Sequence, residues 1–118
     1  MTDYLFVYGT LKEGGINHSC LFDCKFIDSG VCPNSVLADL GAFPGLVFTQ
    51  DTEHVKGEIY QASNIGRSLQ LLDYLEGNGR LFERVCADIT ANSGIVYPCW
   101  VYTWMRGLQQ PTLEDWDV

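Results

Sequence analysis

The carboxylate of Glu76 is the first candidate for chemistry, because of its place in the run LDYLEG at residues 72–77. An apolar helix is predicted to end there, and a negative charge at a helix C-terminus opposes the helix dipole. Burial against Leu75, Tyr74 or Phe82 would raise the pKa of this carboxyl group toward ~6–7, which suits a general base. The alternative is an ordinary exposed glutamate at a helix end.

The second candidate is the main chain of the run FVYGTL at residues 6–11, where a strand passes directly into a glycine turn. Because Gly9 has no Cβ, a ligand can approach the backbone closely. Consecutive N–H groups at such a strand exit form a concave site for an anion such as a carboxylate. The alternative, which the pattern alone favours, is a glycine that only permits a turn. Together the two segments indicate a small acid–base enzyme that binds an amino-acid-like head group.

A metal site or a cysteine nucleophile is a weaker hypothesis. His18, Cys20 and Cys24 lie close in sequence and could share one face of a short helix. A metal would need a fourth ligand at a suitable spacing, and none is evident, so no metal is predicted. A Cys–His nucleophile pair stays open, although no cysteine stands at a glycine-rich elbow.

Two further sets of side chains have both a structural and a functional interpretation. Trp100, Tyr102 and Trp104 alternate along one predicted strand and so share a face, which either packs in the core or lines a pocket. Arg80 and Arg84 could bind a carboxylate, although solvated or ion-paired arginines are more common.

These residues must be positioned by a fold made mostly of strands. Residues 4–8 are almost wholly apolar, which predicts a central strand buried on both faces. Two long strands joined by the turn ANSG predict a hairpin over residues 81–104. Shorter strands are expected at residues 25–31, 35–39, 46–49 and 55–60, a short helix at 16–23, and an irregular tail from 105. Without βαβ alternation, this order predicts an α+β fold, a small mixed, mostly antiparallel β-barrel with flanking α-helices.

One amphipathic helix is expected to follow Asn64, which can cap it, and to run to about Glu76. Leucines at positions 69, 71, 72 and 75 recur at helical spacing and give it an apolar face. Gly77 suits the left-handed conformation that ends a helix. The same helix therefore delivers the candidate carboxylate.

The composition narrows the classes of partner. At 118 residues and 47% hydrophobic, a single domain over residues 1–118 is expected. A net charge of −8, with only seven Lys and Arg residues, argues against nucleic acid and against an anionic membrane surface. Neither a signal peptide nor a membrane-spanning stretch is predicted. Five cysteines without a CxxC pair favour reduced thiols in a cytoplasmic protein.

Six short motifs follow one another along nearly the whole chain: VYGTL at residues 7–11, NH at 17–18, GAFPG at 41–45, VKGEIY at 55–60, LDYLEG at 72–77 and LEDW at 113–116. In this order and spacing they resemble the γ-glutamylcyclotransferase-like family, which includes γ-glutamylamine cyclotransferases and plant defence-induced relatives. Two positions depart from the family pattern. Phe82 stands where tyrosine is frequent, and Glu114 stands where the tail motif usually has glycine.

The resemblance implies a cofactor-independent enzyme that acts on a small-molecule γ-glutamyl substrate. The loop formed by Tyr8, Gly9, Thr10 and Leu11 would hold the α-amino and α-carboxylate end of the γ-glutamyl group. Glu76 would be the catalytic acid and base. Phe43, Phe82 and Tyr102 are expected to line the pocket.

The implied reaction is intramolecular cyclisation of a γ-glutamyl amine or amino acid to 5-oxoproline with release of the free amine, an acyltransferase or lyase reaction. Two alternatives stay open on the same fold. One is a binding module that holds a γ-glutamyl or amino-acid ligand without turnover, and the other is an enzyme specific for a larger γ-glutamyl substrate. The identity of the leaving amine and the oligomeric state are not predicted.

Overall fold

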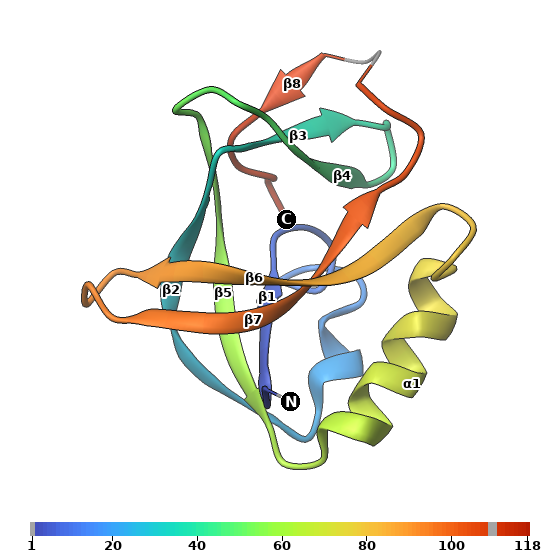
Figure 1. The fold of residues 1–118 in the computed structure, drawn as a ribbon. Helices are drawn as coiled ribbons and strands as arrows, with labels where there is room; N and C mark the ends of the chain where they lie inside the picture. The colour runs from blue at the N-terminus through green and yellow to red at the C-terminus, as the bar shows by residue number, and fades with distance from the viewer. Residues whose placement is uncertain (1, 109–110) are drawn as a thin grey trace.

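The computed structural model describes residues 2–108 and 111–118, and its centre is a small barrel of strands with one long helix against its side (Figure 1). The strands are β1 (Tyr4–Val7), β2 (Cys24–Pro33), β3 (Ser35–Asp39), β4 (Pro44–Phe48), β5 (His54–Ala62), β6 (Phe82–Ala91), β7 (Val96–Trp104) and β8 (Thr112–Leu113). The helices of this described part are the 3-10 helix η1 (His18–Leu21) and the α-helix α1 (Ile65–Glu76).

Five strands close the barrel in the order β1-β5-β2-β6-β7. The first four pairings are antiparallel, and the fifth is parallel, with Tyr4 opposite Cys99 and Leu5 opposite Trp100. Outside the barrel, β4 pairs in parallel with β7, and β3 and β8 extend the sheet. The predicted mixed, mostly antiparallel barrel is therefore confirmed.

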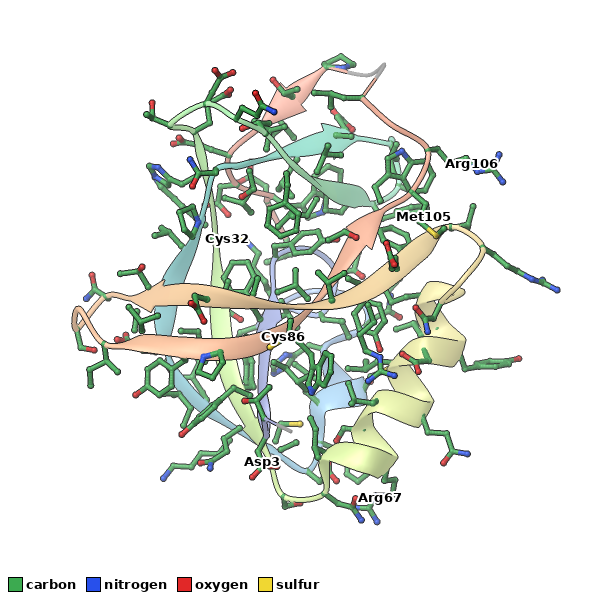
Figure 2. All side chains as sticks on the ribbon, in the orientation of Figure 1. Asp3, Cys32, Arg67, Cys86, Met105 and Arg106 are labelled. Atoms are coloured by element: carbon green, nitrogen blue, oxygen red, sulfur yellow. The ribbon has the colours of Figure 1, made fainter. Side chains whose placement is uncertain are left out.

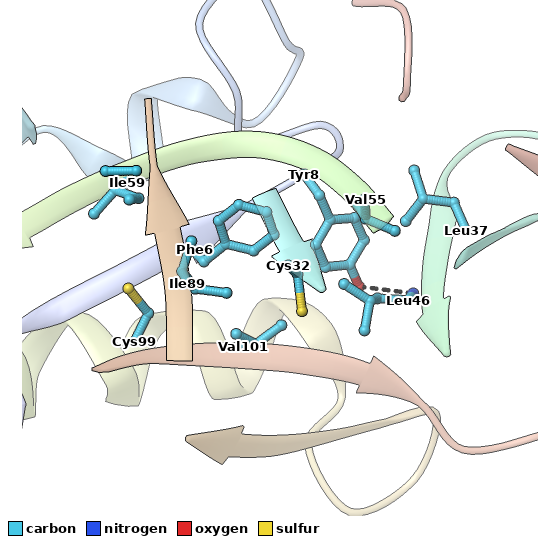
Figure 3. Packing of buried hydrophobic residues seen from close by; sticks show 11 residues of the cluster. Phe6, Tyr8, Cys32, Leu37, Leu46, Val55, Ile59, Ile89, Cys99 and Val101 are labelled. Atoms are coloured by element: carbon cyan, nitrogen blue, oxygen red, sulfur yellow. Dashed lines mark hydrogen bonds between the residues drawn. The ribbon is translucent and has the colours of Figure 1, made fainter. Parts of the chain in front are cut away.

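β1 is buried on both faces, as its apolar composition predicted, because two separate apolar clusters pack against it. Phe6 and the following Tyr8 point into the barrel interior, which Figure 3 shows from close by. Leu5 and Val7 point the other way, toward α1. Alternation along a strand thus places neighbouring residues in different cores.

α1 begins and ends as its sequence predicts. The side chain of Asn64 accepts a hydrogen bond of 3.2 Å from the N–H of Arg67, and Gly77 ends the helix in the left-handed region at φ 60°. The apolar face is narrower than expected. Leu69 and Leu72 are buried, but Leu71 and Leu75 are exposed, because they lie on the neighbouring stripe of the helix.

Two further expectations were wrong in part. The predicted short helix at residues 16–23 is reduced to η1, since the N–H of Asn17 is bonded to the carbonyl of Thr10 and ties this segment to the preceding loop. The tail contains β8, which pairs with β3 in a two-residue ladder too short to leave a pattern in the sequence. No helix in the described ranges is long and apolar enough to cross a bilayer.

Candidate active site

Glu76 is the last residue of α1 and lies on its buried face, because it follows Leu72 by four positions and Leu69 by seven. Desolvation raises the pKa of its carboxyl group from 4.5 to about 7, and no charged neighbour in the described chain contributes to this shift. This value agrees with the range expected from the sequence. Tyr74 plays no part in the burial, however, since it is 89% exposed.

The loop after β1 is held in place by the segment that follows it. The side-chain amide of Asn17 donates a hydrogen bond of 3.0 Å to the hydroxyl oxygen of Thr10, and its N–H bonds the Thr10 carbonyl at 2.9 Å. Nδ1 of His18 lies 2.9 Å from the carbonyl oxygen of Leu11, a hydrogen bond that requires the proton on Nδ1. The consecutive Asn17 and His18 therefore fix two successive residues of the loop.

The main-chain carbonyl groups of this loop accept hydrogen bonds from other residues of the chain, whereas its N–H groups differ in this respect. The carbonyl of Gly9 accepts a hydrogen bond of 3.1 Å from the N–H of Lys12. Among the turn and loop bonds of the described residues, none is donated by the N–H groups of Gly9, Thr10 or Leu11. These three amides remain available to an acceptor outside the chain.

One pocket brings the two candidate segments together. Tyr8, Gly9, Thr10 and Leu11 line it along with Glu76, so a ligand in it meets the loop amides and the desolvated carboxyl group at once. Phe43 and Tyr102 line the same pocket, as expected, together with further residues that the sequence analysis did not assign to it. These further residues are Leu5, Phe6, Val7, Pro44, Leu72 and Trp100.

Phe82 takes a position behind this pocket rather than in its wall. It is buried, its ring centroid is 6.1 Å from that of Phe43, and it lines an adjoining hollow that shares Glu76 with the pocket. Phe82 is thus brought to the site from the start of β6, one short loop after α1.

The hydroxyl group of Tyr8 has a structural role. It donates a hydrogen bond of 2.5 Å to the main-chain carbonyl of Tyr102 and accepts one of 3.2 Å from the N–H of Leu46 (Figure 3). Burial raises the pKa of this phenol far above its ordinary value. Tyr8 therefore contributes its ring to the pocket and ties β1, β4 and β7 together.

Gly9 has a packing role that the sequence did not reveal. A Cβ atom at this position would lie 2.8 Å from Cγ and 2.9 Å from Cδ of Pro44. The missing side chain lets the turn between β3 and β4 close over the loop, and this places Phe43 beside the pocket.

A partly buried chain of polar contacts supports the pocket wall at Tyr102. The Tyr102 hydroxyl donates a hydrogen bond of 2.5 Å to Oδ1 of Asp73, and Nε of Arg84 lies 3.0 Å from the same oxygen. The Arg84 guanidinium also lies over the ring of Trp100, 4.9 Å from its centroid. Arg84 is therefore ion-paired, the more common of the two roles considered for it, and Trp100 and Tyr102 line the pocket. The alternation along β7 was the signal for these two residues.

The cysteines and His18 do not form a cluster. Cys32 and Cys99 are buried in the barrel, whereas Cys86 is exposed on β6 (Figure 2). Within residues 2–108 and 111–118, no group of three or more His, Cys, Asp or Glu side chains is placed to hold a metal ion. Burial raises the pKa of the Cys24 thiol, which makes it a poorer nucleophile at neutral pH.

The fold and the pocket define a class of small barrel protein in which one desolvated carboxyl group shares a pocket with a loop whose Gly9, Thr10 and Leu11 amides donate no turn or loop bond in the described chain. The chain belongs to the family described as gamma-glutamyl cyclotransferase, AIG2-like, whose model matches residues 5–118. The resemblance seen in its motifs is thereby confirmed.

Individual relatives support this assignment. The chain is 32% identical over 120 residues to the Niallia circulans protein named gamma-L-glutamyl-butirosin B gamma-glutamyl cyclotransferase, with coverage of 95% of this chain and 74% of the relative. The crystal structure of a mouse AIG2-like protein superposes with a TM-score of 0.84 at 26% identity, covering 98% and 88% of the two chains. The solution structure of the Escherichia coli protein ytfP gives a TM-score of 0.67 at 28% identity, covering 95% and 92%.

Proposed function

We propose that this protein cyclises a γ-glutamyl amide to 5-oxoproline and releases the free amine, with Glu76 as general acid and base and without a cofactor. The observation that carries the proposal is one pocket lined both by a carboxyl group with a pKa of about 7 and by Gly9, Thr10 and Leu11, whose amides donate no turn or loop bond in the described chain. Such a pKa lets Glu76 both accept and return a proton near neutral pH. The Niallia circulans relative carries a name for this reaction on γ-L-glutamyl-butirosin B.

In the proposed complex the substrate's α-carboxylate accepts hydrogen bonds from the N–H groups of Gly9, Thr10 and Leu11. The substrate's α-ammonium group then lies between the loop and Glu76, which removes one of its protons. The freed amine attacks the γ-carbonyl carbon of the same molecule, and the bond from this carbon to the leaving nitrogen breaks. Glu76 returns the proton to that nitrogen and then carries a second proton to it from the ring nitrogen. The ring nitrogen of 5-oxoproline keeps one hydrogen, the amine leaves as an ammonium ion, and Glu76 is again a carboxylate.

Because the nucleophile and the electrophile belong to one molecule, the protein mainly has to hold the substrate in a folded conformation. Correct orientation of this kind contributes on the order of 7–11 kcal/mol in favourable cases. The rigid anchoring of the loop by Asn17 and His18 supports this role. The cytoplasmic location expected from the cysteines is part of the same proposal.

The test is release of 5-oxoproline from γ-glutamyl amino acids, γ-glutamyl-ε-lysine, glutathione and simple γ-glutamyl amides, with Glu76→Gln beside the wild-type protein. Glutamine keeps the shape of the side chain but cannot accept the proton, so turnover should fall by at least ~10²-fold. Glu83→Gln, at an exposed position of β6, is the matched control and should keep the wild-type rate.

Activity retained in Glu76→Gln would refute the assigned role. Saturable binding of γ-glutamyl compounds without any release of 5-oxoproline would instead favour a binding module on the same fold.

A further inference from the structure

A second hollow adjoins the pocket at Glu76. The two share Thr10, Phe43 and Glu76, so the carboxyl group stands where they meet. The apolar residues of this hollow, called here the outer groove, come from four separate segments of the chain. They are Ile16, Ala42, Phe43, Leu75, Leu81 and Phe82.

The outer groove presents large apolar side chains to solvent. Ile16 is 86% exposed, Leu75 39% and Leu81 38%, although they lie in the loop before η1, at the end of α1 and just before β6. In Figure 1 the end of α1 and the turn between β3 and β4 lie on the same side of the molecule, where these segments converge. Apolar side chains gathered at one exposed hollow beside a catalytic group are characteristic of a ligand site.

The outer groove carries only one ionisable side chain among its described lining residues, which is Glu76 itself. Its other polar side chains are Thr10 and Asn17, which are bonded to each other. A carboxylate on a leaving amine would therefore lose its water without gaining a cationic partner, and an ammonium group would have to compete with the substrate's own α-ammonium group for Glu76. An alkyl or aryl group would lose nothing of this kind and would cover exposed apolar surface.

The order of groups along the substrate indicates which part of it would occupy the outer groove. This step rests on the proposed function, in which the γ-glutamyl group fills the pocket and the leaving nitrogen must reach Glu76 to receive its proton. Whatever is attached to that nitrogen continues past Glu76 on the side away from the loop amides. We propose that the outer groove binds this part of the substrate and selects γ-glutamyl amides of uncharged apolar amines.

The experiment is a series of γ-L-glutamyl n-alkylamides from methyl to hexyl, with γ-glutamyl-ε-lysine as the charged comparison, measured as kcat/KM for 5-oxoproline release. Each added methylene group buried in the outer groove should raise kcat/KM about two- to fourfold until the groove is filled. The kcat/KM of γ-glutamyl-ε-lysine should fall well below that of the butyl amide. A flat series, or a preference for the lysine amide, would overturn the inference while leaving cyclisation established.

Leu81→Asp tests the position of the groove, since Leu81 lines the outer groove but not the pocket that holds the γ-glutamyl group. It should abolish most of the dependence on chain length and leave the methyl amide close to its wild-type rate. Ile95→Asp places the same change at a residue that is 55% exposed on the distant β6–β7 turn and should leave the whole series unchanged. Equal effects of the two substitutions would contradict the assignment.

The proposed function can fail separately. If the wild-type protein releases no 5-oxoproline from any amide, the affinity of the same series is measured by calorimetry. Affinity that rises with chain length in the wild-type protein, but not in Leu81→Asp, would support the outer groove as an apolar site. Affinity independent of chain length would overturn it.

Discussion

The side-chain amide of Asn17 donates a hydrogen bond of 3.0 Å to the hydroxyl oxygen of Thr10, across a turn of seven residues. Together with the bond from the Asn17 N–H to the Thr10 carbonyl, it holds the loop whose amides face the pocket. Asn17 has no place in the proposed proton transfers. It is a positioning residue, and this role is measurable.

Asn17→Ala should therefore weaken substrate binding more than it slows the chemical step. Loss of one neutral hydrogen bond corresponds to about 0.5–1.5 kcal/mol, so we expect KM to rise roughly two- to tenfold with a smaller change in kcat. Steady-state kinetics on the best γ-glutamyl amide provide the measurement. A fall in kcat at constant KM would mean that Asn17 acts in the chemical step instead.

The activity should depend on the ionisation of Glu76. Only the carboxylate form accepts a proton from the substrate, and burial raises the pKa of this group to about 7. The value of kcat/KM should accordingly fall tenfold per pH unit below about pH 7 and level off above it. A pH–rate profile with an acid limb near pH 4.5 would show that Glu76 is not the group that titrates.

The same shift predicts that Glu76→Gln stabilises the folded protein at high pH. Between about pH 4.5 and 7 the folded chain keeps a proton that the unfolded chain has released, so the free energy of unfolding falls as pH rises through this window. At pH 8 the free energy of unfolding of Glu76→Gln should exceed that of the wild-type protein by about 1–2 kcal/mol, after allowance for the partial exposure of Glu76.

Urea unfolding at pH 8 and pH 5 checks this directly. The difference in the free energy of unfolding between Glu76→Gln and the wild-type protein should be present at pH 8 and nearly absent at pH 5. An equal difference at both values would point to packing rather than to ionisation.

Arg84→Met should move the acid limb of the pH–rate profile to higher pH. Arg84 balances the charge of Asp73, which stands three residues before Glu76 on α1. An uncompensated Asp73 would disfavour the charged form of Glu76 and raise its pKa by several tenths of a unit.

Arg67→Met is the matched control, because Arg67 pairs with Asp23 at the opposite end of α1, at 2.6 Å. Its pH–rate profile should coincide with that of the wild-type protein. If Arg84→Met gives that same profile, the Asp73–Arg84 pair has no influence on Glu76.

Tyr8→Phe should cost stability and leave the chemistry intact. It removes a buried hydroxyl group and leaves the Tyr102 carbonyl and the Leu46 N–H without this partner, which costs about 1–3 kcal/mol. The ring that lines the pocket stays. Urea unfolding should show the loss, and kcat should stay within a few-fold of wild type; a hundredfold fall would indicate a role for the hydroxyl group in proton transfer.

The elements that the sequence predicted well are those with local signals. The caps of α1 at Asn64 and Gly77, the long hairpin and the burial of Glu76 follow from residue type and spacing within one segment. The parallel contact of β1 with β7 and the two-residue β8 depend on partners far along the chain, so no short pattern encodes them. Leucine spacing alone did not decide which stripe of α1 is buried.

The site was predicted in the same uneven way. The candidate carboxylate and loop were identified from their own segments, whereas the contact of Gly9 with Pro44 needed the fold. The bonds that Asn17 and His18 make to the loop also needed it, because a motif gives residue identities but no partners.

The closure of the barrel has a consequence for how this protein is made. Tyr4 lies opposite Cys99, and the Tyr8 hydroxyl is bonded to Tyr102, so the two walls of the pocket come from segments that lie 94 residues apart in the sequence. During synthesis the segment through β7 must leave the ribosome before β1 finds its parallel neighbour. Contacts between such distant residues form slowly, which places completion of the site late in folding. A nascent chain that stops before β7 would therefore carry Glu76 and the loop without a pocket to join them.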